Sequence, residues 1–174
     1  MRKARATPAR RAVRSGTKEP PEQDAYDVAV RFLGNRPRSV SEIERHLRGK
    51  RYEPEAIERA IDQLRAQRYV DDVAFARYWV EQRARFRPKG DRALVSELLA
   101  KGVARDTINL AVGERDPDAE LAQAREAIRK PITRWASLSE RDRKRKIQQY
   151  LVARGFSYDT IEAVIARPHQ ETAE

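Results

Sequence analysis

The sequence predicts an all-α protein built from three tandem three-helix repeats that form an elongated, curved array. Two observations lead to this fold class. Apolar residues from Asp24 onward recur at helical spacing, as at Ile57, Ile61 and Leu64, and no segment of useful length alternates as a strand does. In addition, one stretch of helix, tight turn and helix occurs three times along the 174 residues. Small modules of this kind are marginal alone and stack on one another.

The repeat is carried by three segments that superpose without gaps, at offsets of 51 and 53 residues. These segments are Leu47-Arg-Gly-Lys-Arg-Tyr52, Leu98-Leu-Ala-Lys-Gly-Val103 and Leu151-Val-Ala-Arg-Gly-Phe156. Gly102 and Gly155 stand where a helix end favours a left-handed residue. Arg51 occupies this position in the first repeat, so we expect that turn to be built differently, for example around Gly49.

Each of these segments is preceded by a further helix, expected at 24–34, 72–86 and 117–130. Local signals support the helix starts: a capping box of Ser39 with Glu42, prolines at first helical positions, and an N-cap at Asp71. The prolines are Pro54 and Pro117. The expected divisions of the chain are a basic tail at 1–22, three-helix repeats at 23–70, 71–115 and 116–168, and a C-terminal tail at 169–174.

Composition narrows the class of protein. The chain has 37 Lys and Arg against 27 Asp and Glu, a net charge of +10, no cysteine and two histidines. Disulfides and thiolate metal sites are therefore excluded, and a histidine-rich zinc site is disfavoured. No apolar run is long enough to cross a bilayer, and the basic N-terminus lacks the apolar segment of a secretory signal. We expect a soluble cytoplasmic protein with acidic partners.

Residues 1–19 hold seven basic side chains and one acidic side chain, which is +6 of the +10. Few large apolar residues occur there, so the segment cannot offset its ordering entropy by burial, and 1–22 is predicted to be disordered. Two interpretations remain open: an arm that binds phosphates non-specifically, and a leader that only improves solubility.

We find no catalytic constellation and no nucleotide-binding loop, so neither an enzyme nor a cofactor is expected. His46 and His169 have no second histidine at ligand spacing, and each is interpreted as an ordinary helix or tail residue. Asp71 and Asp72 would suit a divalent metal, but a helix cap followed by a first-turn acid explains them without one. No metal site is expected.

The aromatic and basic residues offer better candidates for binding. Phe75 and Trp79 share a helical face with small neighbours and are interpreted as core, whereas Tyr78 remains open between surface and core. Two basic clusters lie in the body of the chain: Arg83, Arg85, Arg87, Lys89 and Arg92, and Arg141, Arg143, Lys144, Arg145 and Lys146. The first surrounds a turn at Pro88, where cations converge more readily on a phosphate or carboxylate. The second circles its helix, as a solvated face does.

Three segments at the centre of the chain form a recognisable pattern: Tyr69-Val-Asp-Asp-Val-Ala-Phe-Ala-Arg77, the basic segment from Arg83 to Gly90, and Leu94-Val-Ser-Glu-Leu-Leu-Ala-Lys-Gly-Val103. With these segments the sequence resembles the RecX regulatory proteins of bacteria. The resemblance covers about residues 24–166. It implies tandem three-helix repeats and a protein that binds filaments of the RecA recombinase on single-stranded DNA along their groove. It also implies inhibition of ATP hydrolysis, strand exchange and filament growth, and so a role in recombination, DNA repair and the SOS response.

We expect the partner, a RecA filament or DNA, to contact exposed basic and aromatic side chains. These are Arg77, Tyr78, Arg83, Arg85, Arg87, Lys89, Arg92, Lys101, Arg143 and Lys144. Single-stranded DNA is expected to be bound directly or through RecA, membranes are not expected to be partners, and a monomer is expected. The alternative is a helical module that binds nucleic acid without RecA. Tight DNA binding that falls steeply with salt would favour this alternative.

Overall fold

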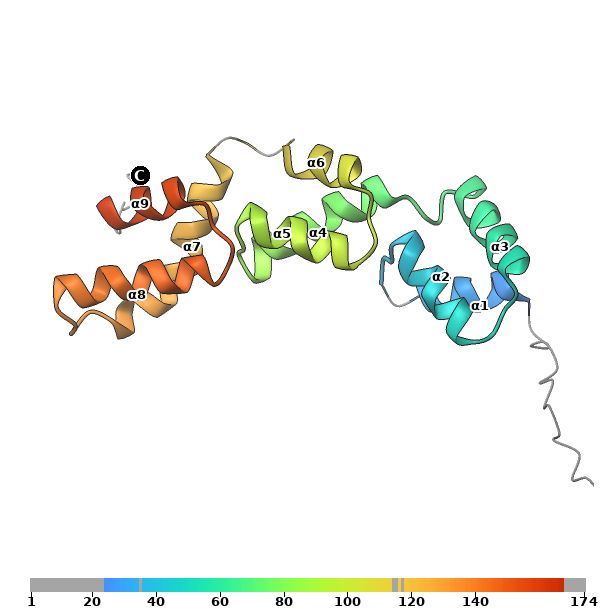
Figure 1. Cartoon of the computed structure of the whole chain (residues 1–174), viewed down its shortest axis with the longest axis horizontal. Coiled ribbons are helices and arrows are strands. Elements are labelled where there is room, and N and C mark those ends of the chain that lie inside the picture. Colours follow the sequence, from blue (N-terminus) through green and yellow to red (C-terminus); the bar gives the residue numbers. More distant parts are fainter. Residues whose placement is uncertain (1–23, 35, 114–115, 117, 168–174) are drawn as a thin grey trace, which may run out of the picture.

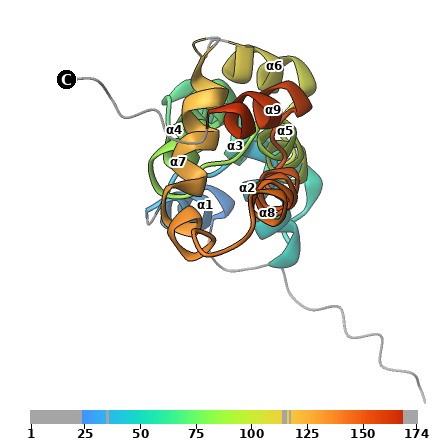
Figure 2. The same ribbon diagram turned by 90° about the vertical axis from the view of Figure 1, so that its left-hand side faces the viewer.

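The computed structural model describes residues 24–34, 36–113, 116 and 118–167. Over these residues the chain forms nine α-helices and no strand, as the sequence predicts. The helices gather in three groups, here called repeats, that follow one another along an elongated molecule (Figure 1). Seen along the long axis, the repeats lie behind one another, so the molecule is a single row (Figure 2).

Each repeat contains three helices. Repeat 1 contains α1 (Ala25–Leu33), α2 (Val40–Gly49) and α3 (Pro54–Ala66). Repeat 2 contains α4 (Asp72–Phe86), α5 (Asp91–Ala100) and α6 (Arg105–Gly113). Repeat 3 contains α7 (Ala119–Arg134), α8 (Glu140–Val152) and α9 (Tyr158–Ala166).

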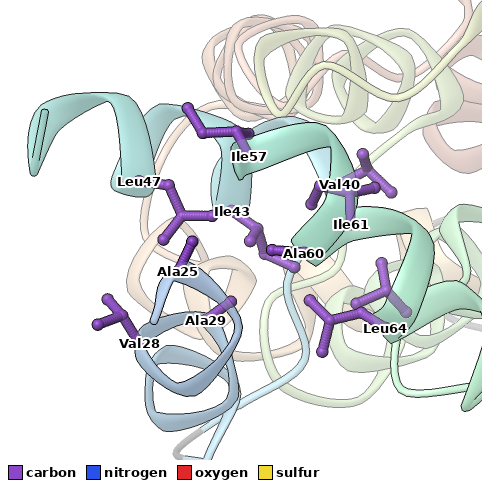
Figure 3. Close-up of a cluster of buried hydrophobic side chains, with 11 residues drawn as sticks. Ala25, Val28, Ala29, Val40, Ile43, Leu47, Ile57, Ala60, Ile61 and Leu64 are labelled. Carbon is purple, nitrogen blue, oxygen red and sulfur yellow. The ribbon is translucent and has the colours of Figure 1, made fainter. Parts of the chain in front are cut away.

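Each repeat has its own hydrophobic core. Two apolar side chains one turn apart on the second helix of each repeat lie at the centre of its core. All six are at most 1% exposed: Ile43 and Leu47, Leu94 and Leu98, Ile147 and Leu151. Figure 3 shows Ile43 between side chains of α1 and α3. Burial of each such side chain stabilises the fold by about 1.5–3 kcal/mol. Phe75 is also buried, and Trp79 packs partly buried against the core of repeat 2, as expected.

Most of the helix starts that the sequence marked are confirmed. Ser39 and Glu42 form the capping box of α2, and Pro54 is the first residue of α3. Asp71 Oδ1 accepts backbone N–H groups of the first turn of α4 at 2.7 and 3.2 Å. The helix end expected at residue 130 is wrong, because α7 continues through Pro131 to Arg134. Pro131 is buried within the helix, and Ile132 packs in the core of repeat 3, so burial offsets the hydrogen bond that proline loses.

The tight turn of each repeat has one geometry. In repeat 1, the N–H of Arg51 donates to the carbonyl of Arg48 at 3.0 Å and the N–H of Tyr52 to that of Leu47 at 3.3 Å. The same two bonds recur in repeats 2 and 3, which is the Schellman pattern. The φ angles are 67° at Arg51, 78° at Gly102 and 77° at Gly155. The expectation that the first turn has a different geometry was therefore wrong, because Arg51 itself adopts the left-handed backbone conformation.

The neighbouring repeat explains why the later turns carry glycine. A Cβ atom added at Gly102 would lie 2.3 Å from the Cβ atom of Ser41 in repeat 1. One added at Gly155 would lie 2.5 Å from the backbone nitrogen of Ala93 in repeat 2. Arg51 is exposed, and no described repeat packs against its turn. Arginine can adopt the positive φ angle of this turn, but a Cβ atom does not fit where the preceding repeat packs against it. The contact between repeats is therefore the stronger reason for glycine at these two positions.

The repeats dock through one recurring contact. The carbonyl of Lys101 accepts a hydrogen bond from Ser39 Oγ at 2.6 Å, and that of Arg154 accepts one from the backbone N–H of Gly90 at 3.0 Å. Lys101 and Arg154 occupy equivalent positions in the repeat pattern, as do Ser39 and Gly90, the N-caps of α2 and α5. Each turn therefore rests on the start of the second helix in the preceding repeat.

The last repeat lacks this docking edge. The position equivalent to Ser39 and Gly90 is Arg143, which lies inside α8 because that helix begins one turn earlier. The backbone N–H of Arg143 already donates to the carbonyl of Ser139 at 2.8 Å. The backbone donor that Gly90 supplies at the second junction therefore has no free counterpart at this position.

The remaining sequence candidates are ordinary structural residues or cannot be placed. His46 is half-buried and stacks on Phe32 with ring centroids 4.0 Å apart. Burial, with the charges of nearby cations, lowers the pKa of His46. Within the described ranges, no group of three His, Cys, Asp or Glu is placed to hold a metal, and no helix is long and apolar enough to span a membrane. The predicted tails, Pro117 and His169 lie outside the described residues.

Candidate partner-binding surface

Within the part of the chain that the structure describes, seven cations line a cleft between repeats 2 and 3. The cleft has a volume of about 780 Å³ and lies between the loop that follows α4 and the faces of α7 and α8. Seven of its lining residues are basic and one, Glu126, is acidic. The basic residues are Arg85, Arg87, Lys89, Arg129, Lys130, Arg134 and Arg154. We call this feature the basic cleft.

Local sequence explains how the α4 loop forms one wall of the cleft. Helix α4 ends at Phe86 because Pro88 follows, and the C-cap Arg87 is no longer helical. Two residues later, Gly90 is the N-cap of α5 and packs directly on repeat 3, where an added Cβ atom would lie 2.3 Å from the carbonyl oxygen of Gly155. This close approach holds the basic loop against α7 and α8.

Helix α7 forms the opposite wall. Glu126 and Arg129 neutralise each other through three contacts of 2.9–3.1 Å. Lys130 and Arg134 are exposed one helical turn apart, and neither pairs with an acid among the described residues. Arg87 across the cleft is likewise exposed and has no such partner in that part of the chain. These three cations are therefore available to an external anion.

Two aromatic rings border the cleft. Phe86 is 65% exposed, and the guanidinium carbon of Arg85 lies 5.2 Å from the centre of its ring. Tyr150 is half-buried, its hydroxyl accepts a hydrogen bond from Arg154 at 2.6 Å, and the same guanidinium lies 4.1 Å from its ring centre. Flat apolar faces thus lie beside positive charges, which is a common arrangement in sites for single-stranded nucleic acid.

Two of the predicted binding residues belong to an internal ion-pair network around Glu97 of α5. The Nε atom of Arg83 lies 2.7 Å from Glu97 Oε2, and Lys89 Nζ pairs with Oε1. The indole nitrogen of Trp79 donates to the same carboxylate at 2.9 Å. Burial alone would raise the pKa of Glu97, but hydrogen bonds from these three donors hold it below its ordinary value. Arg83 and Lys89 thus also hold α4 and its loop on α5.

Lys101 is a second case of internal pairing. Its Nζ atom lies 2.8 Å from Glu42 Oε1 in repeat 1, and it also lies 4.2 Å from the centre of a Trp79 ring. Both charged side chains are less than a fifth exposed. Burial alone would raise the pKa of Glu42, but the hydrogen bond from Lys101 lowers it. Lys101 therefore connects repeats 1 and 2.

The other predicted residues are scattered over the molecule. Arg77 and Arg92 are exposed on α4 and α5, and Tyr78 is half-buried. Arg143 and Lys144 line a groove of about 640 Å³ between α8 and α9, where Lys144 pairs with Glu140 at 2.6 Å. The ten residues do not form one surface, and the structure brings Arg85, Arg87 and Lys89 together in the basic cleft.

Sequence reasoning missed the α7 side of the cleft. Lys130 and Arg134 share a helical face at spacing i, i+4, which is the signal that was available. Their closeness to the α4 loop depends on how repeats 2 and 3 dock and is not visible within either repeat. The exposure of Phe86 at the end of α4 was likewise not predicted from the sequence.

Family models match all three repeats. They describe the first, second and third three-helix domains of RecX and cover residues 25–64, 71–112 and 118–165. The chain belongs to the RecX family. Its matched relatives carry the name regulatory protein RecX.

Relatives and solved structures agree with this assignment. The RecX protein of Pelodictyon phaeoclathratiforme is 35% identical over 81% of this chain and 86% of its own length. That of Mycobacterium ulcerans is 36% identical over 86% of this chain and 88% of its own length. Against the RecX protein of Geobacillus thermodenitrificans, 35% identical, this chain spans only 56% of the relative's length. The crystal structure of RecX from Lactobacillus salivarius has a TM-score of 0.74 at 25% identity, over 82% of this chain and 92% of the other.

Proposed function

We propose that this protein binds RecA filaments on single-stranded DNA and inhibits RecA ATP hydrolysis, strand exchange and filament growth. In this way it would modulate recombination, DNA repair and the SOS response. The observation that carries the proposal is the match of all three repeats to the RecX family. The shape adds support, because a single row of repeats with a long side surface suits an extended partner.

The proposed mechanism needs no chemistry in this chain. A row of repeats that spans successive protomers of a filament would oppose changes in their spacing. ATP hydrolysis and protomer exchange both depend on such changes, so binding alone would slow them. We propose that the protein acts in this way as a cytoplasmic monomer, with the basic cleft among its contacts.

The test is the single-stranded-DNA-dependent ATPase of RecA from the same organism, measured with increasing amounts of this protein. Binding to DNA without RecA is measured alongside, at two salt concentrations. We expect inhibition at amounts well below one molecule per RecA, under conditions where DNA alone is not saturated. Absence of inhibition, together with tight and salt-sensitive DNA binding, would favour the alternative, a nucleic-acid-binding module that acts without RecA.

A further inference from the structure

The charge balance of the basic cleft differs from that of two other grooves formed by the described residues. The groove between α2 and α3 is lined by three acids and two arginines, so its charges nearly cancel. The groove between α8 and α9 has two acids and two cations. The basic cleft has seven cations and one acid. Lys89 pairs with Glu97 and Arg129 with Glu126, so the positive excess comes from the other five cations. Like charges in one cleft repel each other, and this excess is unfavourable until an anion binds.

The arrangement of these cations fits a chain of phosphates better than a single anion. Arg87 lies on the loop wall, whereas Lys130 and Arg134 lie a turn apart on the α7 wall, so positive charge lines both sides of an open cleft. Consecutive phosphates of one strand can pair with cations along such a cleft. Each pairing releases condensed counterions, which makes the affinity depend on salt.

Phe86 provides the second, independent feature. Its ring is 65% exposed at the edge of the cleft, although a phenylalanine on α4 has a core beside it in which to be buried. The nearby Arg85 guanidinium leaves much of the ring accessible. Exposed rings beside cations are the usual platform on which the bases of a single strand stack, without preference for sequence.

We propose that the basic cleft holds the sugar–phosphate backbone of a single DNA strand, with Phe86 stacked on one of its bases. This inference rests on the proposed function and deepens it, because it assigns one contact to DNA rather than to RecA. An acidic protein surface would also pair with the cations, but it offers no flat base for Phe86. The exposed ring therefore favours a nucleic acid.

The experiment measures fluorescence anisotropy of labelled oligo(dT) with the full-length protein at several salt concentrations. The test variant is Arg87→Glu/Lys130→Glu/Arg134→Glu. The matched control is Arg48→Glu/Arg59→Glu/Arg105→Glu, which removes the same charge at exposed positions outside the cleft. We expect the cleft variant to bind at least about tenfold more weakly at low salt. We also expect its log–log salt slope to be smaller by about 2, for three phosphate contacts. The control should change affinity by less than about threefold.

Phe86→Ala separates stacking from charge. Loss of one stacked base is expected to weaken oligo(dT) binding by about fivefold or more and to leave the salt slope unchanged. Circular dichroism of each variant verifies that the helices are retained. Phe86→Leu, which keeps an apolar side chain but no ring, should behave like Phe86→Ala if stacking is the cause.

Each other outcome has a definite meaning. Equal oligo(dT) binding by the cleft and control variants would overturn the proposal, as would no binding by the wild-type protein at low salt. Unchanged DNA binding with lost RecA inhibition in the cleft variant would assign the cleft to an acidic protein surface instead. Wild-type binding to oligo(dT) without any effect on RecA would leave this site standing and refute the proposed function.

Discussion

Both junctions between repeats have a hydrogen bond to the turn carbonyl of the later repeat, from Ser39 Oγ at the first and from the Gly90 N–H at the second. They differ in the other side chains around this bond. At the junction of repeats 1 and 2, Lys101 pairs with Glu42, and Asp72 accepts the N–H of Val40 at 2.9 Å. At the junction of repeats 2 and 3, the equivalent of Lys101 is Arg154, which turns back onto Tyr150 of its own repeat. An ion pair thus crosses the first junction, whereas at the second junction Arg87, Lys130 and Arg134 line the cleft without an acidic partner among the described residues.

A carboxylate with neutral donors replaces the ion pair at the second junction. Glu120 of α7 accepts hydrogen bonds from Ser157 Oγ at 2.7 Å and Thr160 Oγ1 at 2.6 Å, both at the start of α9. It also accepts the N–H of Asp91 in repeat 2 at 3.1 Å. Because these donors carry no charge, Glu120 does not pair with any of the cations that line the cleft. The hydrogen bond to the turn carbonyl determines how two repeats stack. The side chains around it determine which cations at the junction are left without an acidic partner.

The largest expected effect comes from adding a side chain where the repeats touch. Gly155→Ala should destabilise the protein by about 2–5 kcal/mol, because the left-handed φ angle and the collision with Ala93 both penalise a Cβ atom. Urea unfolding followed by circular dichroism measures the change. The control is Gly49→Ala, where no atom lies within 4 Å of the added Cβ atom and a gain of up to about 1 kcal/mol is expected. Equal stability of Gly155→Ala and wild type would refute the close docking of repeats 2 and 3.

The next effect distinguishes the two equivalent cations. Lys101→Met should cost about 1.5–3 kcal/mol of unfolding free energy, because it leaves the half-buried Glu42 without its charged donor. Arg154→Met should cost less, since Arg154 makes no ion pair across its junction among the described residues. Denaturant unfolding of both variants compares them directly. An equal loss of unfolding free energy in the two variants would contradict the conclusion that an ion pair stabilises only the first junction.

Acid titration should affect the junctions through their carboxylates. Hydrogen bonds hold the pKa values of Glu42 and Glu120 below the ordinary 4.5, although burial acts in the opposite direction. Each group therefore stabilises the fold above pH 4.5, and this contribution is lost as the pH falls through the lowered folded-state pKa. Burial raises the pKa of Asp72, so its contribution has the opposite sign.

The measurement is the thermal unfolding midpoint as a function of pH. Glu42→Gln and Glu120→Gln should each flatten the acid loss, and Asp72→Asn should make it steeper. If the unfolding temperature of the wild-type protein did not decrease as the pH is lowered from 4.5, the lowered pKa values of Glu42 and Glu120 would be contradicted.

The smallest expected effect concerns the unpaired cations of the cleft. Lys130→Gln should raise the unfolding midpoint by about 1 °C at low salt, because one of several mutually repelling charges is removed. The gain should vanish at high salt, where such repulsion is screened. Lys144→Gln serves as the comparison, since it removes a charge that pairs with Glu140 and should lower the midpoint slightly. A fall for Lys130→Gln would show that the cleft cations are paired in solution.

Much of the fold could be predicted because its signals are local. Helical spacing identified core positions such as Ile57, Ile61 and Leu64, and the glycine turns identified the repeat. The error at Arg51 is instructive. The turn geometry follows from hydrogen bonds within the repeat and tolerates arginine. Gly102 and Gly155 are required because the preceding repeat packs against them, and a contact between repeats is not visible in the local sequence.

The candidate site was less predictable because it depends on contacts between distant segments. Arg83 and Lys89 looked like free cations in a basic run, yet both fold onto Glu97 of the next helix. Lys130 and Arg134 lie more than 40 residues from Arg87 in sequence and reach the same cleft only through docking. A run of basic residues in the sequence therefore indicates where the surface is basic. Ion pairs with acidic residues of neighbouring helices then determine which of these cations are still available to a partner.

The first repeat of the array has a consequence for how copies share a long substrate. Arg51 fills the position at which the turns of repeats 2 and 3 carry glycine and touch the preceding repeat. The first repeat of one copy therefore does not fit against another copy in the way that repeats 2 and 3 fit against their predecessors. Copies bound along a filament or strand, as proposed above, would then lie beside one another without this end-to-end contact.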